Sequence, residues 1–329
     1  MTTEHTRPAM DSPWRFGARL AAFLCMHGAI VAYLVCKAPS DTNHFLASVV
    51  EKHARADSIA APRILFVGGS NLAFGLDSLT IERATGIPTV NLGLHAALGM
   101  EFMLCEARGV VRAGDTVVLS LEYEHFFGDI TGDLLADVVR YRPELVGDLS
   151  LRLDKRLMDR AHIYLGRRMA AGYERVRYDR NPRSEVPYSR DGFNERGDLI
   201  AHRGLEQRPA ALTARLSGHL AVIPPIDAHE PRRLLRQFVE YCDKRGVRVY
   251  YTFPPVSEEN TRLFERESSA VVAVLRESGM PALLDTPQEV ALPTACFFDT
   301  SYHLLGEGIR RRSEGIATAL GEAMSKPGK

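Results

Sequence analysis

The sequence predicts an α/β fold in which a parallel sheet is covered by helices on both faces. Short apolar runs, such as residues 63–67 (RILFV), end in glycine or polar turns, as buried parallel strands do. Each run is followed by a stretch with helical periodicity, and this alternation is typical of strands joined by helical crossovers. Ligands of such sheets bind at the carboxyl ends of the strands, so we expect the functional residues there.

Composition and charge exclude several classes of protein. The 329 residues are 45% hydrophobic and 25% charged, with 41 basic and 41 acidic side chains. These values are typical of a globular protein and argue against a disordered chain or a nucleic-acid-binding protein. Five scattered cysteines without a CxxC, and the lack of an HExxH, argue against a disulfide framework and a zinc site. We therefore expect no cofactor and no metal.

The expected elements alternate along the chain. Strands are predicted at residues 63–67, 88–91, 115–121, 247–253 and 281–284. Helices are predicted at residues 45–56, 77–84, 99–111, 230–245, 258–278 and 306–324. A polar region at residues 126–225 interrupts the alternation and contains one arginine-rich helical stretch, residues 151–178. We expect this region to be an insertion of helix and loop.

Residues 20–36 (LAAFLCMHGAIVAYLVC) form an apolar run without Asp, Glu, Lys or Arg. Extended back to Phe16, the run is long enough to cross a bilayer as a helix. A cleavable signal peptide and a buried core helix are the alternatives. However, no clear small-x-small cleavage site follows, and the apolar residues surround the helix rather than forming a stripe. The sequence favours an uncleaved membrane anchor at residues 16–37.

The charges that flank this segment predict its orientation. Arg7, Arg15 and Arg19 lie before the apolar run, whereas Lys37 alone follows it at once. The positive-inside rule then places the tail, residues 1–15, in the cytoplasm. We expect a linker at residues 38–62, followed by one domain at residues 63–329, with its insertion, in the periplasm or outside the cell. The chain is thus expected to be a single-pass protein of the cell membrane.

The first candidate site follows the first predicted strand, which ends in Gly68-Gly69-Ser70-Asn71. The glycines permit a sharp turn and the close approach of a substrate. Ser70, at the start of the next helix, is placed to act as a nucleophile near backbone N–H groups. The alternative is a serine that only caps the helix. The turn is not the GxSxG elbow, because Leu72 stands where the last glycine would be.

A second candidate site precedes the closing helix, in the segment FFDTSYHL at residues 297–304. His303 is placed to accept the proton of a serine, and Asp299 to orient the imidazole ring. At i and i+4, the two side chains meet if the turn is helical. The alternative is a capping aspartate beside a partly buried histidine.

The two sites together resemble blocks of the SGNH (GDSL-like) hydrolase superfamily. The resemblance is closest to its membrane-anchored branch, which includes the alginate O-acetylation and teichoic-acid D-alanylation proteins. FVGGSNLAFGLD is similar to the nucleophile block of that family, and FFDTSYHLLGEGI to its last block. The segment NLG, residues 91–93, resembles the second block, whose glycine supplies a backbone N–H to the oxyanion hole.

This resemblance covers about residues 63–125 and 230–320. It implies a three-layer α/β/α domain with a five-stranded parallel sheet. It also implies that Ser70 is the nucleophile, that His303 is the base and that Asp299 holds His303.

The sequence departs from the family pattern at two places. The usual third block carries an asparagine that helps to bind the oxyanion, but here the third strand ends in LEYEH, residues 121–125. The oxyanion hole is therefore expected to consist of the backbone N–H groups of Ser70 and Gly93, with Asn71 as a further candidate. The Asp–His spacing is also one residue longer than the usual DxxH.

Glu122, Glu124 and His125 lie at this third strand end, beside the proposed site. One of the two glutamates is a candidate for orienting a substrate hydroxyl or His303, and His125 is a further candidate base. The alternatives for the glutamates are a solvated strand end and a salt bridge to an arginine.

The arginine-rich stretch at residues 151–178 has three interpretations. Its tyrosines and arginines suit sugars and anionic polymers, so it is a candidate lid or acceptor platform. It is also compatible with an amphipathic helix that packs its Leu and Met side chains and solvates its arginines. A third interpretation is that the arginines touch lipid headgroups.

The resemblance implies a membrane-anchored serine acyl-transfer enzyme, an O-acetyltransferase or acetylesterase acting on a cell-surface polysaccharide. Its partners would be that polysaccharide, or another acyl acceptor, and an acyl-donor protein of the membrane. Two alternatives are open. One is a non-catalytic SGNH-like binding component of a polysaccharide synthesis or export complex, motivated by the missing asparagine. The other is a free-standing esterase or lipase for small esters.

Overall fold

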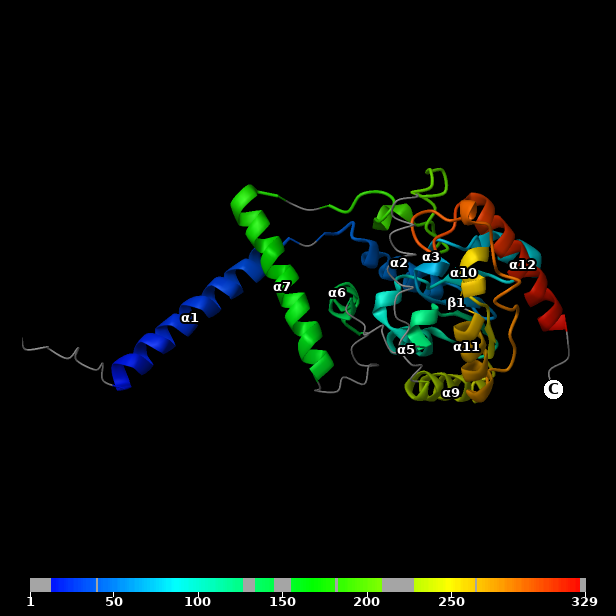
Figure 1. Ribbon diagram of the computed structural model, residues 1–329, viewed down its shortest axis with the longest axis horizontal. Helices are drawn as coiled ribbons and strands as arrows, with labels where there is room; N and C mark the ends of the chain where they lie inside the picture. Colours follow the sequence, from blue (N-terminus) through cyan, green and yellow to red (C-terminus); the bar gives the residue numbers. More distant parts are fainter. Residues whose placement is uncertain are drawn as a thin grey trace, which may run out of the picture. The chain divides into compact units, whose positions relative to one another are not determined.

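The computed structural model describes residues 13–39, 41–126, 134–144, 155–180, 183–208, 228–263 and 265–325 (Figure 1). The chain divides into two compact units. The first comprises Met1–Asp41 and Ala161–Pro182, and the second comprises Thr42–Arg160 and Arg183–Lys329. The second unit contains the sheet and both candidate blocks.

The centre of the second unit is a parallel sheet of four strands. In chain order these are β1 (Ile64–Gly68), β2 (Thr89–Asn91), β3 (Thr116–Ser120) and β4 (Arg248–Tyr251). They are arranged β2-β1-β3-β4, and each neighbouring pair is parallel. β1 and β3 are buried along their whole length, which explains their largely apolar sequences. The predicted α/β class with a parallel sheet is confirmed.

The predicted fifth strand, residues 281–284, is wrong as a strand of the sheet. Among the described residues, a single parallel bridge forms there, between Tyr251 and Leu283. Pro281 has no N–H to donate to a ladder. At the other end of the segment, the Asp285 carboxylate accepts hydrogen bonds from the Phe253 N–H, at 2.8 Å, and from the Thr252 hydroxyl. The side chain of Asp285 thus takes the place of further backbone pairing.

Helices cover both faces of this sheet. The helices that lie wholly within this unit are α2 (Val49–Ser58), α3 (Ser70–Ala73), α4 (Ser78–Thr85), α5 (Met100–Val110), α6 (Leu135–Val139), α9 (His229–Asp243), α10 (Glu258–Leu263), α11 (Glu265–Glu277) and α12 (Gly306–Ser325). Short 3₁₀ turns lie at Phe45–Ser48, Ala96–Leu98, Tyr123–Phe126, Arg190–Gly192 and Thr294–Cys296. The predicted helix at residues 258–278 is divided between α10 and α11.

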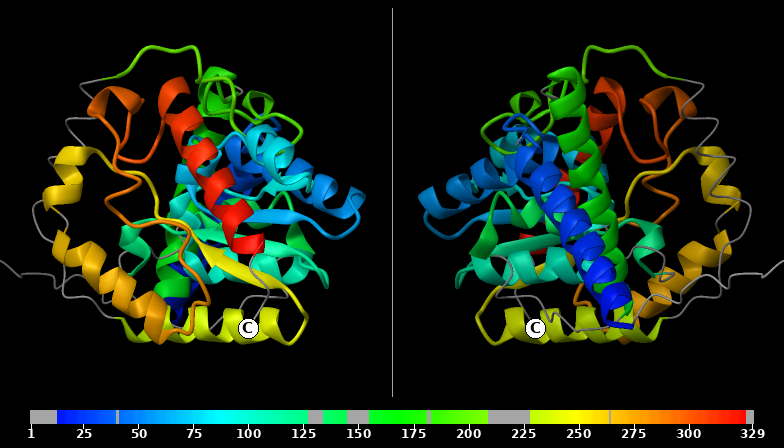
Figure 2. Two further views of the ribbon diagram at one scale, coloured as in Figure 1. Left: turned by 90° about the vertical axis from the view of Figure 1, so that its right-hand side faces the viewer. Right: turned by 90° about the vertical axis from the view of Figure 1, so that its left-hand side faces the viewer.

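Side chains of β1 point alternately into two separate cores. Ile64 and Phe66 pack with Ile316 of α12, whereas Leu65 and Val67 belong to the larger cluster that includes Phe102 of α5. α4 packs against α12, and α5 against α9. The left view of Figure 2 shows α12, in red, lying across the near face of the sheet. The unit therefore has a layer of helices on each side of the sheet.

The topology places one turn at the middle of the carboxyl edge. β1 lies between β2 and β3, so the residues that follow β1 are flanked by those that follow its two neighbours. Ser70 follows β1, Gly93 follows β2, and Glu122 follows β3. Because the strands are parallel, all three ends lie at the same edge of the sheet.

The first unit contains α1 (Pro13–Lys37) and most of α7 (Lys155–Tyr178). α1 is a 25-residue helix that is long and apolar enough to cross a membrane, and none of its residues is buried. The predicted apolar N-terminal helix is thus confirmed as a helix. α7 falls within the arginine-rich stretch, of which residues 151–154 lie outside the described residues.

Candidate active site

The turn after β1 is held tightly against the end of β3. A Cβ on Gly68 would lie 2.0 Å from the Ser120 carbonyl oxygen, and one on Gly69 would lie 2.3 Å from Glu122 Oε1. Any side chain at these two positions would therefore displace β3 or Glu122. Ser70 is half-buried and begins α3, where its carbonyl oxygen accepts the Phe74 N–H at 2.9 Å.

The second block forms a closed loop that carries a hydrogen-bonded dyad. His303 Nδ1 lies 2.8 Å from Asp299 Oδ1, and both residues are 5% exposed. The Thr300 hydroxyl oxygen accepts the His303 N–H at 3.1 Å, and the Phe298 N–H donates to the His303 carbonyl oxygen at 2.8 Å. These bonds fix the turn that brings Asp299 and His303 together.

Phe74 brings this loop to the turn that carries Ser70. Its ring is parallel to the His303 ring, with an interplanar angle of 5° and 3.8 Å between the ring centroids. Phe74 follows Ser70 by four residues, so their side chains lie on the same face of this helical turn. The structure therefore places the imidazole of His303 beside the turn that begins with Ser70.

Two residues of the insertion, which the sequence did not point to, support the same loop. The Tyr188 hydroxyl donates a hydrogen bond to Asp299 Oδ2. His202 Nε2 lies 2.8 Å from the Leu304 carbonyl oxygen and 3.1 Å from that of Phe74, so its N–H links the two blocks. Burial lowers the pKa of His202 to about 4, which keeps its ring neutral at neutral pH.

A buried arginine of α12 holds the turn that carries Ser70 and Asn71. Arg312 of α12 donates from Nη1 to the Asn71 carbonyl oxygen at 2.7 Å and from Nη2 to Asn71 Oδ1 at 2.8 Å. Nη2 also lies 2.9 Å from Ser120 Oγ, which donates to Asn71 Oδ1. Burial lowers the pKa of Arg312 to about 10, so the side chain is still a cation at neutral pH. No sequence motif signals this contact.

Two of the predicted oxyanion donors have hydrogen-bond acceptors within the protein. The Gly93 N–H donates to Asn91 Oδ1 at 2.9 Å, and the Asn71 N–H donates to Glu122 Oε1 at 3.1 Å. The Asn71 side-chain amide donates to the Ser120 carbonyl oxygen at 2.9 Å. Among the described residues, Ser70 N–H has no such acceptor. Of the predicted donors, the Ser70 N–H is therefore the one available to an oxyanion. Gly93 and Asn71 could donate to it only by giving up their present hydrogen bonds.

Glu122 lies beside the turn that carries Ser70, as its position in the sequence predicts. It is 1% exposed, and among the described residues its Oε2 has no hydrogen-bond partner. His125 Nδ1 lies 3.5 Å from this oxygen. The Glu122 carboxylate therefore lies against Gly69 and the Asn71 N–H.

Glu124 and His125 make contacts of a structural kind. Glu124 Oε2 accepts the Tyr302 hydroxyl at 2.8 Å, and burial raises the pKa of Glu124. His125 Nε2 lies 3.1 Å from the Ala96 carbonyl oxygen, and Nδ1 lies 3.1 Å from that of Glu122. Their roles as substrate contact and further base stay predictions.

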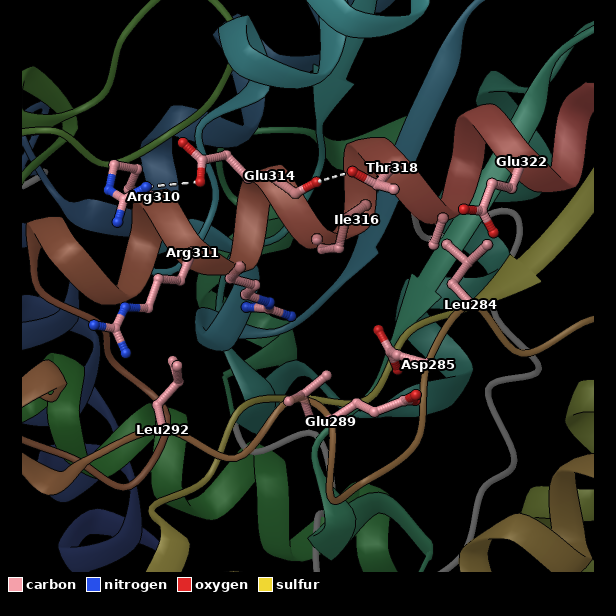
Figure 3. A pocket seen from close by; sticks show the side chains of 14 residues that line it. Leu284, Asp285, Glu289, Leu292, Arg310, Arg311, Glu314, Ile316, Thr318 and Glu322 are labelled. Atoms are coloured by element: carbon pink, nitrogen blue, oxygen red, sulfur yellow. Dashed lines mark hydrogen bonds and ion pairs between the residues drawn. The ribbon is translucent and has the colours of Figure 1, made fainter.

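A separate pocket of about 640 Å³ lies between α12 and the segment from Leu284 to Leu292 (Figure 3). Its wall includes Asp285, whose pKa burial raises to about 6, and Arg312. Ser70, Asp299 and His303 do not line it, so it is not the place where the predicted acyl group would bind. Within the described part of the chain, no group of three or more His, Cys, Asp or Glu side chains is placed to hold a metal ion.

Comparison with known proteins finds no family model that matches the chain and no curated protein that matches its sequence. The geometry of the site is therefore the basis for the function proposed below.

Proposed function

We propose that the chain is a membrane-anchored, SGNH-like serine acyl-transfer enzyme. The observation that carries this proposal is the Asp299–His303 pair, at 2.8 Å, stacked on the ring that lies one helical turn after Ser70. A serine becomes a nucleophile when a neighbouring base accepts its proton, and a carboxylate behind the base keeps it in the required tautomer. The dyad and the serine turn supply these three roles.

In the proposed reaction, Ser70 Oγ attacks the carbonyl carbon of an acyl ester. His303 takes the hydroxyl proton, while Asp299 accepts the Nδ1–H and stabilises the imidazolium. The Ser70 N–H stabilises the oxyanion, and His303 then returns the proton to the leaving alcohol. The acyl group on Ser70 passes next to water, as in an esterase, or to a sugar hydroxyl, as in a transferase.

The proposed substrate is an acetyl ester on a cell-surface polysaccharide, with a donor protein in the same membrane. Support for this setting comes from α1, which is long and apolar enough to anchor the domain. The charges around α1 favour a cytoplasmic N-terminus and a domain in the periplasm or outside the cell.

The proposal is tested with the purified full-length protein in detergent and p-nitrophenyl acetate as substrate. We expect Ser70→Ala and His303→Ala to reduce hydrolysis to the background of the free ester. Ser269→Ala, which changes an exposed serine of α11, is the matched control and should retain full activity. Equal rates for the wild type and Ser70→Ala would refute the proposal.

A second candidate function is a non-catalytic binding component of a polysaccharide synthesis or export complex. It is favoured by the hydrogen bonds that occupy the Gly93 and Asn71 N–H groups and by the Glu122 carboxylate beside them. An ionised carboxylate cannot donate to an oxyanion. This candidate predicts that Ser70→Ala retains polysaccharide binding and complex assembly in cells. The first candidate predicts loss of polymer acetylation.

A further inference from the structure

The helix α7 contacts α1 near the C-terminal end of α1. A Cβ on Gly172 would lie 1.9 Å from the Leu34 carbonyl oxygen, so the two helix backbones are in direct contact there. Leu34 precedes Lys37, the last residue of α1, by three residues, or about 5 Å along the helix axis. Lys37 lies over the Tyr33 ring at 5.8 Å, and such Lys and Tyr side chains mark the membrane–water interface.

Arg168 joins the two helices at the same level. Its Nη2 donates to the Ala38 and Val35 carbonyl oxygens at 2.8 and 3.3 Å, and its Nη1 donates to that of Pro39 at 3.0 Å. Ala38 and Pro39 follow α1, so the helix offers their carbonyl oxygens no N–H, whereas the Val35 carbonyl oxygen also accepts the Ala38 N–H at 3.3 Å. Figure 1 shows the two helices diverging from this crossing rather than running side by side.

An apolar stripe of α7 continues past the contact with α1. Leu165, Met169, Gly172 and Val176 recur at helical spacing and therefore share one face. Gly172 is buried against α1, whereas Leu165 and Val176 are 41% and 49% exposed. Tyr173, beside the stripe, is 50% exposed.

The polar residues of α7 are predominantly cationic. Between Ala161 and the end of α7 at Tyr178 there is one acidic side chain, Glu174, and a larger set of arginines: Arg167, Arg168, Arg175 and Arg177. Arg175 pairs with Asp179 at 2.7 Å, and Glu174 with Arg180 at 3.1 Å. An apolar stripe with arginines around it is the pattern of helices that lie within a membrane interface, buried about 5–10 Å into the headgroup region. That depth agrees with the position of Leu34 below the end of α1.

We propose that α7 is a second membrane contact, lying in the interface that the C-terminal end of α1 reaches. The stripe from Leu165 to Val176 enters the acyl boundary, and arginines outside the contact with α1, Arg177 among them, bind anionic lipid headgroups. The proposal assumes that α1 spans the membrane, and it does not depend on the chemistry at Ser70. Because α7 is fixed to α1 through Gly172 and Arg168, the contact with lipid also fixes the orientation of α7 at the surface.

The test uses tryptophan quenching in the full-length chain. Trp14 is the single tryptophan, so Trp14→Phe gives a background without tryptophan. Three reporters are then added one at a time: Phe23→Trp on α1, Val176→Trp on the stripe and Tyr178→Trp on the opposite face of α7. The proteins are reconstituted into phosphatidylcholine vesicles with 20% phosphatidylglycerol, and the phosphatidylcholine carries brominated acyl chains (about one anionic lipid in five, enough to attract arginines).

We expect bromine to quench Val176→Trp severalfold more strongly than Tyr178→Trp. Quenching of Phe23→Trp shows separately that α1 is inserted. If Phe23→Trp is quenched and Val176→Trp is not, or if the two α7 reporters are quenched equally, the proposal is wrong although the anchor stands. If the quenching of Val176→Trp instead falls as the protein-to-lipid ratio rises, a second copy of the chain covers the stripe. That result would also contradict the proposal.

Two matched changes sharpen the test. Gly172→Ala places a methyl group against the Leu34 backbone and should reduce the quenching of Val176→Trp, whereas Gly166→Ala, with open space around its Cβ, should not. Arg177→Gln should lower the ratio of lipid-bound to lipid-free α7, measured by the quenching of Val176→Trp, about fivefold in anionic vesicles. In vesicles of pure phosphatidylcholine the same change should have little effect. Quenching that is indifferent to Arg177 and to lipid charge would contradict the headgroup contact.

Discussion

The loop at residues 297–304 and the insertion segment at residues 183–208 support the same histidine, but they do so in different ways. The loop holds Asp299 against His303 through bonds among its own residues, such as the one from the His303 N–H to Thr300. The segment reaches the site from elsewhere in the chain, with Tyr188 on Asp299 and His202 between the two blocks. The comparison shows that the Asp299–His303 pair forms within the loop, whereas the segment fixes the position of that pair.

The largest effect should come from the loop itself. Asp299→Asn keeps the shape of the side chain but no longer offers His303 Nδ1–H a charged acceptor. We expect the rate of ester hydrolysis to fall by about 10⁴-fold, because the imidazole is then held in the wrong tautomer. Steady-state kinetics with p-nitrophenyl acetate measures this. A loss below tenfold would show that Asp299 does not serve His303 in catalysis.

Phe74 connects the two blocks, so its truncation should affect folding as well as activity. Phe74→Ala removes a ring that is 1% exposed and stacked on His303. We expect the free energy of unfolding to decrease by about 3–5 kcal/mol, as for other buried phenylalanines. Chemical denaturation in detergent measures the change, and Phe74→Leu should lose markedly less. Equal stability of the wild type and Phe74→Ala would contradict the packing described here.

His202 tests the insertion segment through pH. Its folded-state pKa, about 4, is below the ordinary value of 6.5, so the unfolded chain binds a proton in this interval more readily than the folded protein does. Its contribution to stability is complete above pH 6.5 and is lost as the pH falls through 4. The loss amounts to about 3 kcal/mol at 1.36 kcal/mol per pKa unit.

His202→Gln retains a side-chain N–H but does not titrate. The pH dependence of unfolding between 6.5 and 4 should therefore become flatter in this variant. An identical pH profile for the wild type and His202→Gln would show that His202 does not cause the loss of stability at low pH.

The smallest effect on the rate of hydrolysis is expected for Tyr188, which contacts Asp299 from the insertion segment. Tyr188→Phe removes one hydrogen bond to Asp299 and leaves the bond to His303 in place. A bond to a charged acceptor contributes about 1.5–3 kcal/mol, so we expect a loss of roughly ten- to a hundredfold in the rate of hydrolysis. A loss as large as that of Asp299→Asn would mean that the segment takes part in the chemistry.

The difference between these two regions also explains what the sequence can predict. The apolar strands were predictable because both faces of the sheet are buried. The contact of Asp299 with His303 was predicted for a helical turn, but the turn is not helical, and the bonds of Thr300 and Phe298 to His303 bring the two side chains together instead. Tyr188 and Arg312 were not, because their contacts join residues far apart in the chain and follow from the packing of α12 and the insertion. The occupied N–H groups of Gly93 and Asn71 are likewise invisible until the side chains of Asn91 and Glu122 are placed.

The error at residues 281–284 has a similar cause. The segment has the apolar composition of a strand, but Pro281 and the Asp285 side chain limit its pairing to one bridge. The local pattern predicts that a segment is suited to a sheet, and its neighbours decide how much of the ladder forms.

The most direct test of the account is the labelling of the full-length protein by a fluorophosphonate, which reacts with serines activated by a neighbouring base. We expect stoichiometric labelling, located at Ser70 by mass spectrometry, with strongly reduced labelling in His303→Ala and none at this position in Ser70→Ala. Labelling confined to another residue, or a folded protein that does not label at all, would contradict the assignment of Ser70 as the nucleophile.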